Sequence, residues 1–330
     1  MLRDGWAGRV ICPSRGPPSS QAMASTTQEP EIRTAQWWGK PLADRLVSEV
    51  RERWESQARP SEDPPCLASV GLGEGSPFHV YQRQQARVAQ RAGIRFRGEI
   101  LPRDVSPEGL RARVEELAKD ASIHGILLEH PLPPAHDFAR IVSGINPWKD
   151  VDGVGPTNVG NLATGRPVQV PAVALAARAL LQHYGEPTAG RHVVVVGRSE
   201  TVGIPLALLF LLRGERGDAT VTVVHSRTVD LAEHLRRAEI LIPCAGRPGL
   251  VSRRNTSRGA VVVDVGLATA MGPDPSAPPR VAGDADARSL EGWARAYTPV
   301  PGGVGPVTVA EIMASTVRSW EAARTGGDRT

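Results

Sequence analysis

The chain has 330 residues, of which 41% are hydrophobic and 4% aromatic, and a formal net charge of +4, enough material for two domains that each bury a core. Its arginines are scattered among acids, its aromatics are few, no segment has the length of an apolar membrane span, and residues 1–22 lack a signal-peptide core, so neither a nucleic-acid partner nor a membrane is expected. Cys12, Cys66 and Cys244 have no paired spacing, and the three histidines 124, 130 and 136 recur every six residues, so we expect no disulfide, no metal site and a reducing cytoplasm.

The N-terminal segment is expected to be disordered. Residues 1–32 are rich in Pro, Ser, Gly and Arg and show no periodicity. Met23 offers an alternative start, so whether residues 1–22 are translated stays open. Ordered structure is expected from about Trp37, with a helix from Lys40 to about residue 55.

Strand-like and helix-like segments then alternate along the chain. In order, we predict a strand over 66–71, a helix ending before Gly93, a strand over 95–101, a helix over 107–120, a strand over 125–128, helices over 137–145 and 173–184, a strand over 192–196, a helix over 204–212, a strand over 219–224, a helix over 230–238, strands over 239–244 and 260–265, and a helix over 308–324.

This order predicts the α/β class, with two α/β domains whose sheets are mainly parallel. The first domain is expected to span residues 33–170 and the second residues 171–306. The C-terminal helix, within residues 307–325, is predicted to pack back on the first domain, which would leave a cleft between the two.

A strand followed by a glycine turn begins the second domain. Val193 to Val196 read as a strand buried on both faces, as in the centre of a parallel sheet. Gly197 ends the strand, and Gly203 opens an apolar helix, so backbone N–H groups and the positive end of the helix dipole point at the turn. This arrangement predicts a phosphate cradle. The spacing is not G-x-G-x-x-G, so a βα crossover packed tightly by its glycines is the alternative.

The residues at two strand ends favour NADP over NAD. A 2′-phosphate suits arginines and hydroxyls at the end of the second strand, whereas a free 2′-hydroxyl suits an acid there. Arg198 and Ser199 follow the first strand, Ser226 and Arg227 follow the next, and no acid stands at that strand end. The alternative is that these four residues are solvated loop residues.

Five motifs resemble one known family. They are Gly125-Ile126-Leu127-Leu128 before Pro131-Leu132-Pro133; Lys149-Asp150-Val151-Asp152-Gly153; Gly197-Arg198-Ser199-x-x-Val202-Gly203-x-Pro205; His225-Ser226-x-Thr228; and Thr298-Pro299-Val300-Pro301-Gly302-Gly303-Val304-Gly305-Pro306. In this order they resemble the bifunctional methylenetetrahydrofolate dehydrogenase/cyclohydrolase family from about Trp37 to Arg324.

The resemblance implies a folate-binding catalytic domain followed by a Rossmann-like NADP-binding domain, in a subunit that forms homodimers through the cofactor domains. It also implies oxidation of 5,10-methylenetetrahydrofolate with NADP and hydrolysis of the methenyl product to 10-formyltetrahydrofolate in the same cleft. By motif, Gly197, Arg198, Ser199 and Ser226 would hold the cofactor, and Gly203 of the glycine turn and Arg227 at the strand end complete the expected cofactor site.

The substrate residues also follow from the resemblance. Pro131, Pro301, Gly302 and Gly303 would line the pterin and aminobenzoate path, where glycine lets the backbone approach a flat ligand. Asp152 would accept paired N–H donors of the pterin, a charge-assisted contact. Without the family context, Asp152 would be expected to cap a turn, because Asp-Gly is a common turn pair.

The family's catalytic pair is a tyrosine with a lysine four residues later, and here the lysine is missing in either of two alignments. One alignment places the pair on Tyr81 and Gln85, and the other on His79 and Arg83. We favour the first, because loops absorb insertions and two extra residues inside a helix would rotate the remainder by roughly 200°.

Further departures fall near the reacting centre. Glu129 replaces the family's glutamine, and it would stabilise the methenyl cation or, in the second alignment, pair with Arg83. Adding water requires proton transfers that a lysine supplies and a glutamine does not, whereas hydride transfer needs no titrating side chain. We therefore expect a dehydrogenase with weak or lost cyclohydrolase activity. The alternatives are a specialised paralogue that handles the one-carbon unit in a biosynthetic pathway, and a non-catalytic folate- or NADP-binding protein.

Overall fold

The computed structural model describes residues 31–73, 78–214, 217–270 and 280–326, and the side chains of residues 78–80, 269 and 270 are not described. The disorder expected for the N-terminal segment therefore falls almost entirely outside the described residues. Residues 32–330 form one compact unit.

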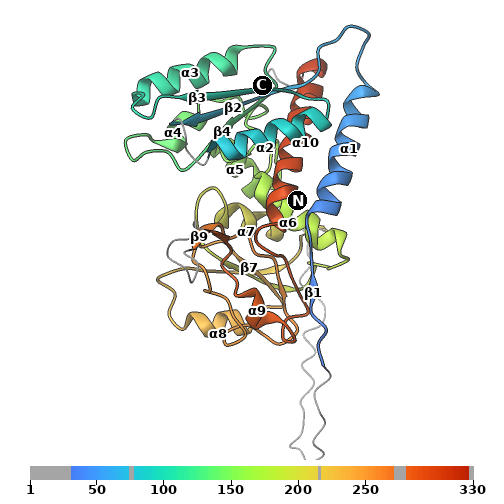
Figure 1. Cartoon of the computed structure of the whole chain (residues 1–330), viewed down its shortest axis with the longest axis vertical. Coiled ribbons are helices and arrows are strands. Elements are labelled where there is room, and N and C mark those ends of the chain that lie inside the picture. The colour runs from blue at the N-terminus through green and yellow to red at the C-terminus, as the bar shows by residue number, and fades with distance from the viewer. Residues whose placement is uncertain (1–30, 74–77, 215–216, 271–279, 327–330) are drawn as a thin grey trace, which may run out of the picture. The chain divides into compact units, whose positions relative to one another are not determined.

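Two parallel sheets organise that unit (Figure 1). The first has the order β3-β2-β4, with β2 (Cys66–Leu72) pairing in parallel with β3 (Arg95–Leu101) and β4 (Gly125–Leu128). The second has the order β1-β11-β8-β7-β5-β6, and all of its neighbouring strands pair in parallel. The predicted class, two α/β domains with mainly parallel sheets, is confirmed.

The remaining elements have the following bounds. The strands of the second sheet are β1 (Ala35–Gln36), β5 (His192–Val196), β6 (Thr220–Val224), β7 (Ile240–Pro243), β8 (Val261–Val262) and β11 (Ala296–Tyr297), and β9 (Ala268–Ala270) pairs antiparallel with β10 (Arg280–Ala282). The helices are α1 (Lys40–Glu55), α2 (Phe78–Arg91), α3 (Pro107–Lys119), α4 (Phe138–Val142), α5 (Pro156–Ala163), α6 (Ala172–His183), α7 (Gly203–Leu211), α8 (Leu231–Arg236), α9 (Ala287–Leu290) and α10 (Val304–Thr325).

Helices cover both faces of the first sheet, because alternate strand residues point to opposite sides. Ala68 and Val70 of β2 pack in the cluster that includes Leu110 and Val114 of α3. Leu67 packs in a second cluster, with residues of α1, α2 and α10. Ser69 is two residues after Leu67, so its hydroxyl lies on the same face of β2, the face that α2 covers.

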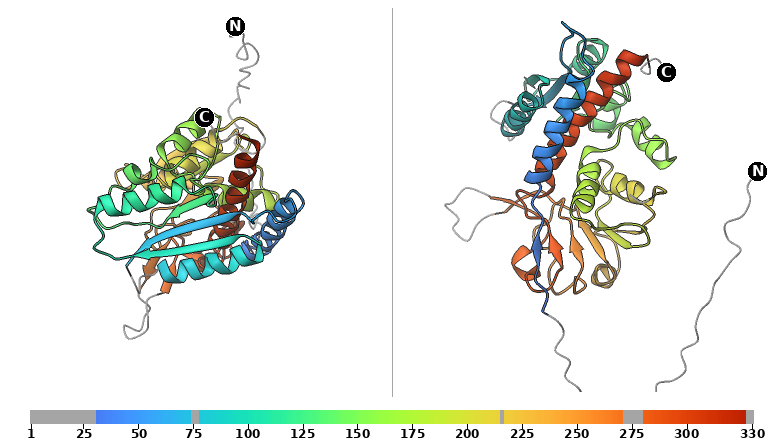
Figure 2. Two further views of the ribbon diagram at one scale, coloured as in Figure 1. Left: turned by 90° about the horizontal axis from the view of Figure 1, so that it is seen from above. Right: turned by 90° about the vertical axis from the view of Figure 1, so that its right-hand side faces the viewer.

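The four valines of β5 divide in the same way between two clusters. Val193 and Val195 pack with α6, α7 and α10, whereas Val194 and Val196 pack with α8 and α9. All four are buried, as predicted for a central strand. Figure 2 shows α1 and α10 running side by side. The cluster that holds Val193 also holds Leu67 of the first sheet, so one core continues through both sheets instead of the two separate cores that the length led us to expect.

The chain also departs from the predicted element order. The prediction omits α5 and leaves residues 266–296 as an inserted loop, where the structure has β9, β10, α9 and β11. Ala35 and Gln36, expected at the start of the first domain, form a strand beside β11 in the second sheet. These elements are short: β1 pairs with the distant strand β11, and β9 and β10 pair with each other, which no local periodicity reveals.

Candidate active site

The carboxylate of Glu129 is held at the end of β4. Its oxygen Oε1 accepts hydrogen bonds from Gln85 Nε2 at 2.7 Å and from Ser69 Oγ at 3.0 Å. Burial raises the pKa of Glu129, and these two hydrogen bonds oppose that shift. No lysine or arginine of the described residues forms an ion pair with Glu129, so its carboxylate is held by two neutral donors.

The structure places Tyr81 and Gln85, and not Arg83, beside Glu129. Gln85 is 5% exposed and contacts Glu129 directly. Tyr81 is half-exposed, and burial together with the Glu129 charge raises its pKa. Arg83 is exposed beside Phe96 and forms no ion pair with Glu129, and the side chain of His79 lies outside the described residues. The contacts therefore match the first alignment, and the Glu129–Arg83 pair considered for the second is not formed.

Two polar residues that the sequence analysis did not select complete this cluster. Ser69 bonds Glu129, and Gln82 Nε2 donates to the backbone oxygen of Ser69 at 3.0 Å and to its hydroxyl at 3.2 Å. The signal for Ser69 was present, because it is the one polar side chain in the apolar strand β2. Gln85 Oε1 is buried and finds no hydrogen-bond partner among the described residues.

The turn that contains Asp152 is capped by the side chain of Asp150. Asp150 accepts hydrogen bonds from the backbone N–H of Gly153 at 3.1 Å and of Gly155 at 2.8 Å. The Asp152 side chain is 16% exposed, and its Oδ2 lies 4.0 Å from Nε2 of His130. Asp150 therefore caps this turn, and the alternative considered for Asp152, that it caps the turn, is not observed.

The electrostatics of Asp152 favour its neutral form. Burial, with the nearby charges of Asp150 and Glu129, raises the pKa of Asp152 to about 7. Burial also lowers the pKa of His130, so the imidazole stays neutral at pH 7 and adds no compensating positive charge. Paired N–H donors from a ligand would stabilise the ionised form of Asp152.

The two proline segments expected to line the substrate path lie in different parts of the chain. Pro131 and Pro301 are both exposed, and each follows a cis peptide bond. Gly302 has φ +112°, and a Cβ there would lie 2.7 Å from the Trp38 ring. A Cβ on Gly303 would lie 2.7 Å from the backbone oxygen of Pro299. The packing of the protein itself requires both glycines, so the expected reason, room for a flat ligand, is not needed to explain them.

The glycines of the turn between β5 and α7 are likewise required by packing within the protein. Gly197 has φ +144° and faces Cys244, and a Cβ on Gly203 would lie 2.3 Å from the backbone oxygen of Gly197. The backbone N–H groups of residues 198–202 donate no hydrogen bond to another described residue. Free N–H groups at the start of a helix are suited to an anion, so close glycine packing and a phosphate cradle coexist in this turn.

The cofactor candidates meet at one edge of the second sheet. Val196 of β5 pairs with Val224 of β6, so Arg198 and Ser199 follow one strand and Ser226 and Arg227 follow its neighbour. All four side chains are exposed. β7 lies on the other side of β5, so the turn stands where the strand order reverses, the usual site of a dinucleotide in such sheets.

Within the described ranges, no three His, Cys, Asp or Glu side chains are arranged to hold a metal ion. Among the helices described, none has the length and apolar character needed to cross a bilayer.

A glycine turn at the reversal point of the second sheet, together with carboxylates that follow β4 of the first sheet, is typical of a two-domain α/β enzyme of the NAD(P)-binding class. Residues 38–152 match the catalytic domain of tetrahydrofolate dehydrogenase/cyclohydrolase, and residues 171–324 match the NAD(P)-binding domain of the same family. The chain belongs to the tetrahydrofolate dehydrogenase/cyclohydrolase family.

Individual relatives cover most of the chain. The bifunctional protein FolD of Nitratidesulfovibrio vulgaris is 42% identical over 289 residues, 87% of this chain and 97% of the relative. That of Thermus thermophilus is 41% identical over 281 residues, 85% and 94% of the two chains. The structure of the Trypanosoma brucei methylenetetrahydrofolate dehydrogenase-cyclohydrolase, complexed with NADP and an inhibitor, is 35% identical with a TM-score of 0.79 and covers 90% of this chain and 99% of its own.

Proposed function

We propose that this protein oxidises 5,10-methylenetetrahydrofolate to 5,10-methenyltetrahydrofolate with NADP as the hydride acceptor, and that its cyclohydrolase step is weak or lost. The observation that carries the second part is the contact between Gln85 and Glu129 at 2.7 Å. An amide at this position donates a hydrogen bond but does not titrate, so it supplies no proton for the addition of water.

The residues at the sheet edge fit a phosphorylated dinucleotide. The N–H groups of residues 198–202 would bind the pyrophosphate, and Arg198, Ser199, Ser226 and Arg227 would bind the 2′-phosphate. When bound, NADP supplies the hydride acceptor. The structure of the Trypanosoma brucei relative in complex with NADP supports this choice.

The carboxylates would hold the substrate and adjust its charge. Asp152 would accept the N–H donors of the pterin, with Pro131, Pro301, Gly302 and Gly303 along the ligand path. Glu129 carries its negative charge without a cationic partner among the described residues, so it would stabilise the positive charge of the methenyl product. Tyr81, one helical turn from Gln85, would close the same face of α2.

Assaying both steps with purified protein tests this assignment. We expect NADPH formation from methylenetetrahydrofolate, slow decay of methenyltetrahydrofolate, and at least about tenfold faster decay in Gln85→Lys, which restores a titrating amine. The control is Gln90→Lys, an exposed site on the same helix that should change neither rate.

Rapid methenyl hydrolysis by the unmodified protein would contradict the loss of the second step. If that hydrolysis disappeared in Glu129→Gln, the carboxylate itself would be its general base. Binding of NADP and folate without turnover would instead identify a non-catalytic binding protein.

We also propose a cytoplasmic homodimer joined through the NADP-binding domains. Ile204 and Leu211 of α7 are 39% and 55% exposed, and Val223 of the edge strand β6 is 39% exposed. Apolar side chains beside an unpaired strand edge favour pairing with a second copy. The free thiols of Cys66 and Cys244 are compatible with a reducing compartment.

A further inference from the structure

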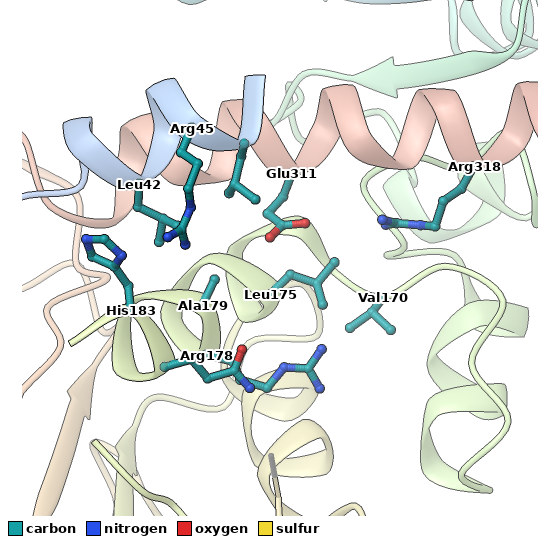
Figure 3. Close-up of a pocket in the computed structure, with 11 residues that line it drawn as sticks. Leu42, Arg45, Val170, Leu175, Arg178, Ala179, His183, Glu311 and Arg318 are labelled. Carbon is teal, nitrogen blue, oxygen red and sulfur yellow. The ribbon is translucent and has the colours of Figure 1, made fainter. Parts of the chain in front are cut away.

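A cavity of about 560 Å³ lies between α1, α6 and α10 (Figure 3). Its walls are partly apolar, with Leu42, Leu46, Val170 and Leu175 among the lining side chains. None of the residues around it belongs to the Glu129 cluster or to the glycine turn, so it is separate from the proposed active site.

Charged groups from three helices converge on this cavity. Arg45 comes from α1, Arg178 from α6, and Arg318 and Glu311 from α10. Three arginines and one glutamate leave a net charge of +2 on the lining. His183 adds no charge at pH 7, because burial and the charge of Arg45 lower its pKa. A lining of this kind selects for a net anionic ligand.

Glu311 places a negative charge among the arginines that line the cavity. In the view of Figure 3 its carboxylate lies between the guanidinium groups of Arg45, which comes from α1, and Arg318, further along α10. No described residue donates a hydrogen bond to this carboxylate or forms an ion pair with it within 4.0 Å. Burial raises the pKa of Glu311, and the charges of Arg318 and Arg178 oppose that shift. A partly buried carboxylate of this kind is stabilised by an N–H donor from a ligand.

The two flanking arginines keep donors available. Arg318 Nη2 donates to Ser315 Oγ at 2.8 Å and to Gln169 Oε1 at 3.5 Å. The guanidinium group has five N–H donors, and those that these two bonds do not use can contact a ligand. Arg45 is 54% exposed on its side chain and approaches Glu49 at 3.5 Å, an exposed pair that contributes little stability. A ligand carboxylate can displace this weak contact.

We propose that the cavity binds a small amino dicarboxylate, with its ammonium on Glu311 and its two carboxylates on Arg45 and Arg318. The order of charges in the ligand, negative at both ends and positive between, is the reverse of the order in the lining. The apolar side chains of α1 and α6 would cover the methylene groups of the ligand.

Isothermal titration calorimetry of the full chain tests this site with L-glutamate, L-aspartate and glutarate, the last of which has two carboxylates and no amine. We expect at least one of the two amino acids to bind with a dissociation constant of about 1 mM or tighter and to raise the melting temperature, and glutarate to bind about tenfold more weakly. The variant Arg45→Gln should weaken binding about tenfold. Its matched control is Arg51→Gln, which removes an equivalent exposed i,i+4 pair on the same helix, outside the cavity.

A second variant, Glu311→Gln, separates the role of the amine. It should remove the preference for the amino acid over glutarate. Absence of binding by both amino acids would overturn the proposal, as would binding that Arg45→Gln leaves unchanged, or glutarate binding as tightly as the amino acids. Because Arg45 and Glu311 lie outside the active site, these outcomes do not depend on whether the protein oxidises methylenetetrahydrofolate.

Discussion

Gln85 and Glu129 show how a change of residue type alters the chemistry that a site can perform. The Gln85 amide donates a hydrogen bond to the Glu129 carboxylate at 2.7 Å, so the two side chains are held in direct contact. Under the proposed function, the carboxylate would stabilise a cationic product, whereas an amide does not titrate and supplies no proton for the addition of water. This difference is the physical basis of our proposal that the two activities are separated.

Asp152 leads to a prediction about pH. Its pKa is raised from 3.8 to about 7, so the neutral form predominates below pH 7, and a neutral carboxyl accepts the pterin N–H groups poorly. We expect the KM for methylenetetrahydrofolate to rise as the pH falls through about 7, with a smaller change in kcat, in steady-state assays. Asp152→Asn should raise KM at pH 8 and remove this dependence. A KM profile that stays pH-dependent in the variant would assign the effect to another group.

The raised pKa of Asp152 also makes the stability of the fold depend on pH. Because the folded pKa lies above the unfolded value, the stability that the neutral Asp152 contributes is present below pH 3.8 and is lost as the pH rises to about 7. The fold therefore maintains a carboxylate whose ionisation is unfavourable without a ligand. That cost is understandable if the ionised form is needed to bind substrate.

At the scale of elements, the turn between β5 and α7 combines two requirements. Gly197 and Gly203 are required by close approach within the turn, and the N–H groups of residues 198–202 remain available to a ligand. Arg198 is exposed in this turn, at the sheet edge it shares with Ser226 and Arg227. The positions of the side chains therefore follow from the pairing of β5 with β6.

Arg198→Ala should raise the KM for NADP about tenfold or more and change the KM for NAD far less, because only NADP carries a 2′-phosphate for the guanidinium. Initial-rate kinetics with both dinucleotides measure the difference. The control is Arg213→Ala, an exposed arginine beyond the other end of α7. Equal losses for the two dinucleotides would reject the assignment of Arg198 to the 2′-phosphate.

At the scale of the whole described unit, α10 links the sheets. Trp320 near its C-terminal end is 1% exposed and packs edge to face with Trp54 of α1, with ring centres 6.4 Å apart. Val304 and Val307 at its other end belong to the same core as Val193 of β5. The final helix thus joins the first sheet to the second instead of packing on one alone.

Association of two copies is tested on the exposed face of α7 and β6. A charge at Leu211 or Val223 would be desolvated in an interface, so Leu211→Glu and Val223→Glu should convert the dimer to a monomer in sedimentation velocity runs. Val281→Glu alters a similarly exposed apolar residue, 46% exposed on β10, and should leave the dimer intact. A monomeric unmodified protein would refute the homodimer.

Much of this architecture could be predicted from local pattern. The valines of β5, the Lys40-Pro41 start of α1 and the strand over β2 follow from periodicity and turn residues, and the bounds of these elements agree closely with the prediction. The alignment that places the pair on Tyr81 and Gln85 stays a prediction, with which the contact of Gln85 with Glu129 is compatible. The short strands β1, β9 and β10 were not predicted, since they form by pairing with segments that local sequence does not identify.

The sequence by itself determined the α/β class, the family and the glycine turn, because each depends on residue type and on spacing along the chain. Only the tertiary structure decided that Ser69 and Gln85 hold Glu129, that Asp150 caps the turn while Asp152 does not, and that Arg45, Glu311 and Arg318 surround one cavity. These facts depend on which distant side chains approach one another, and that is set by how helices and strands pack in three dimensions.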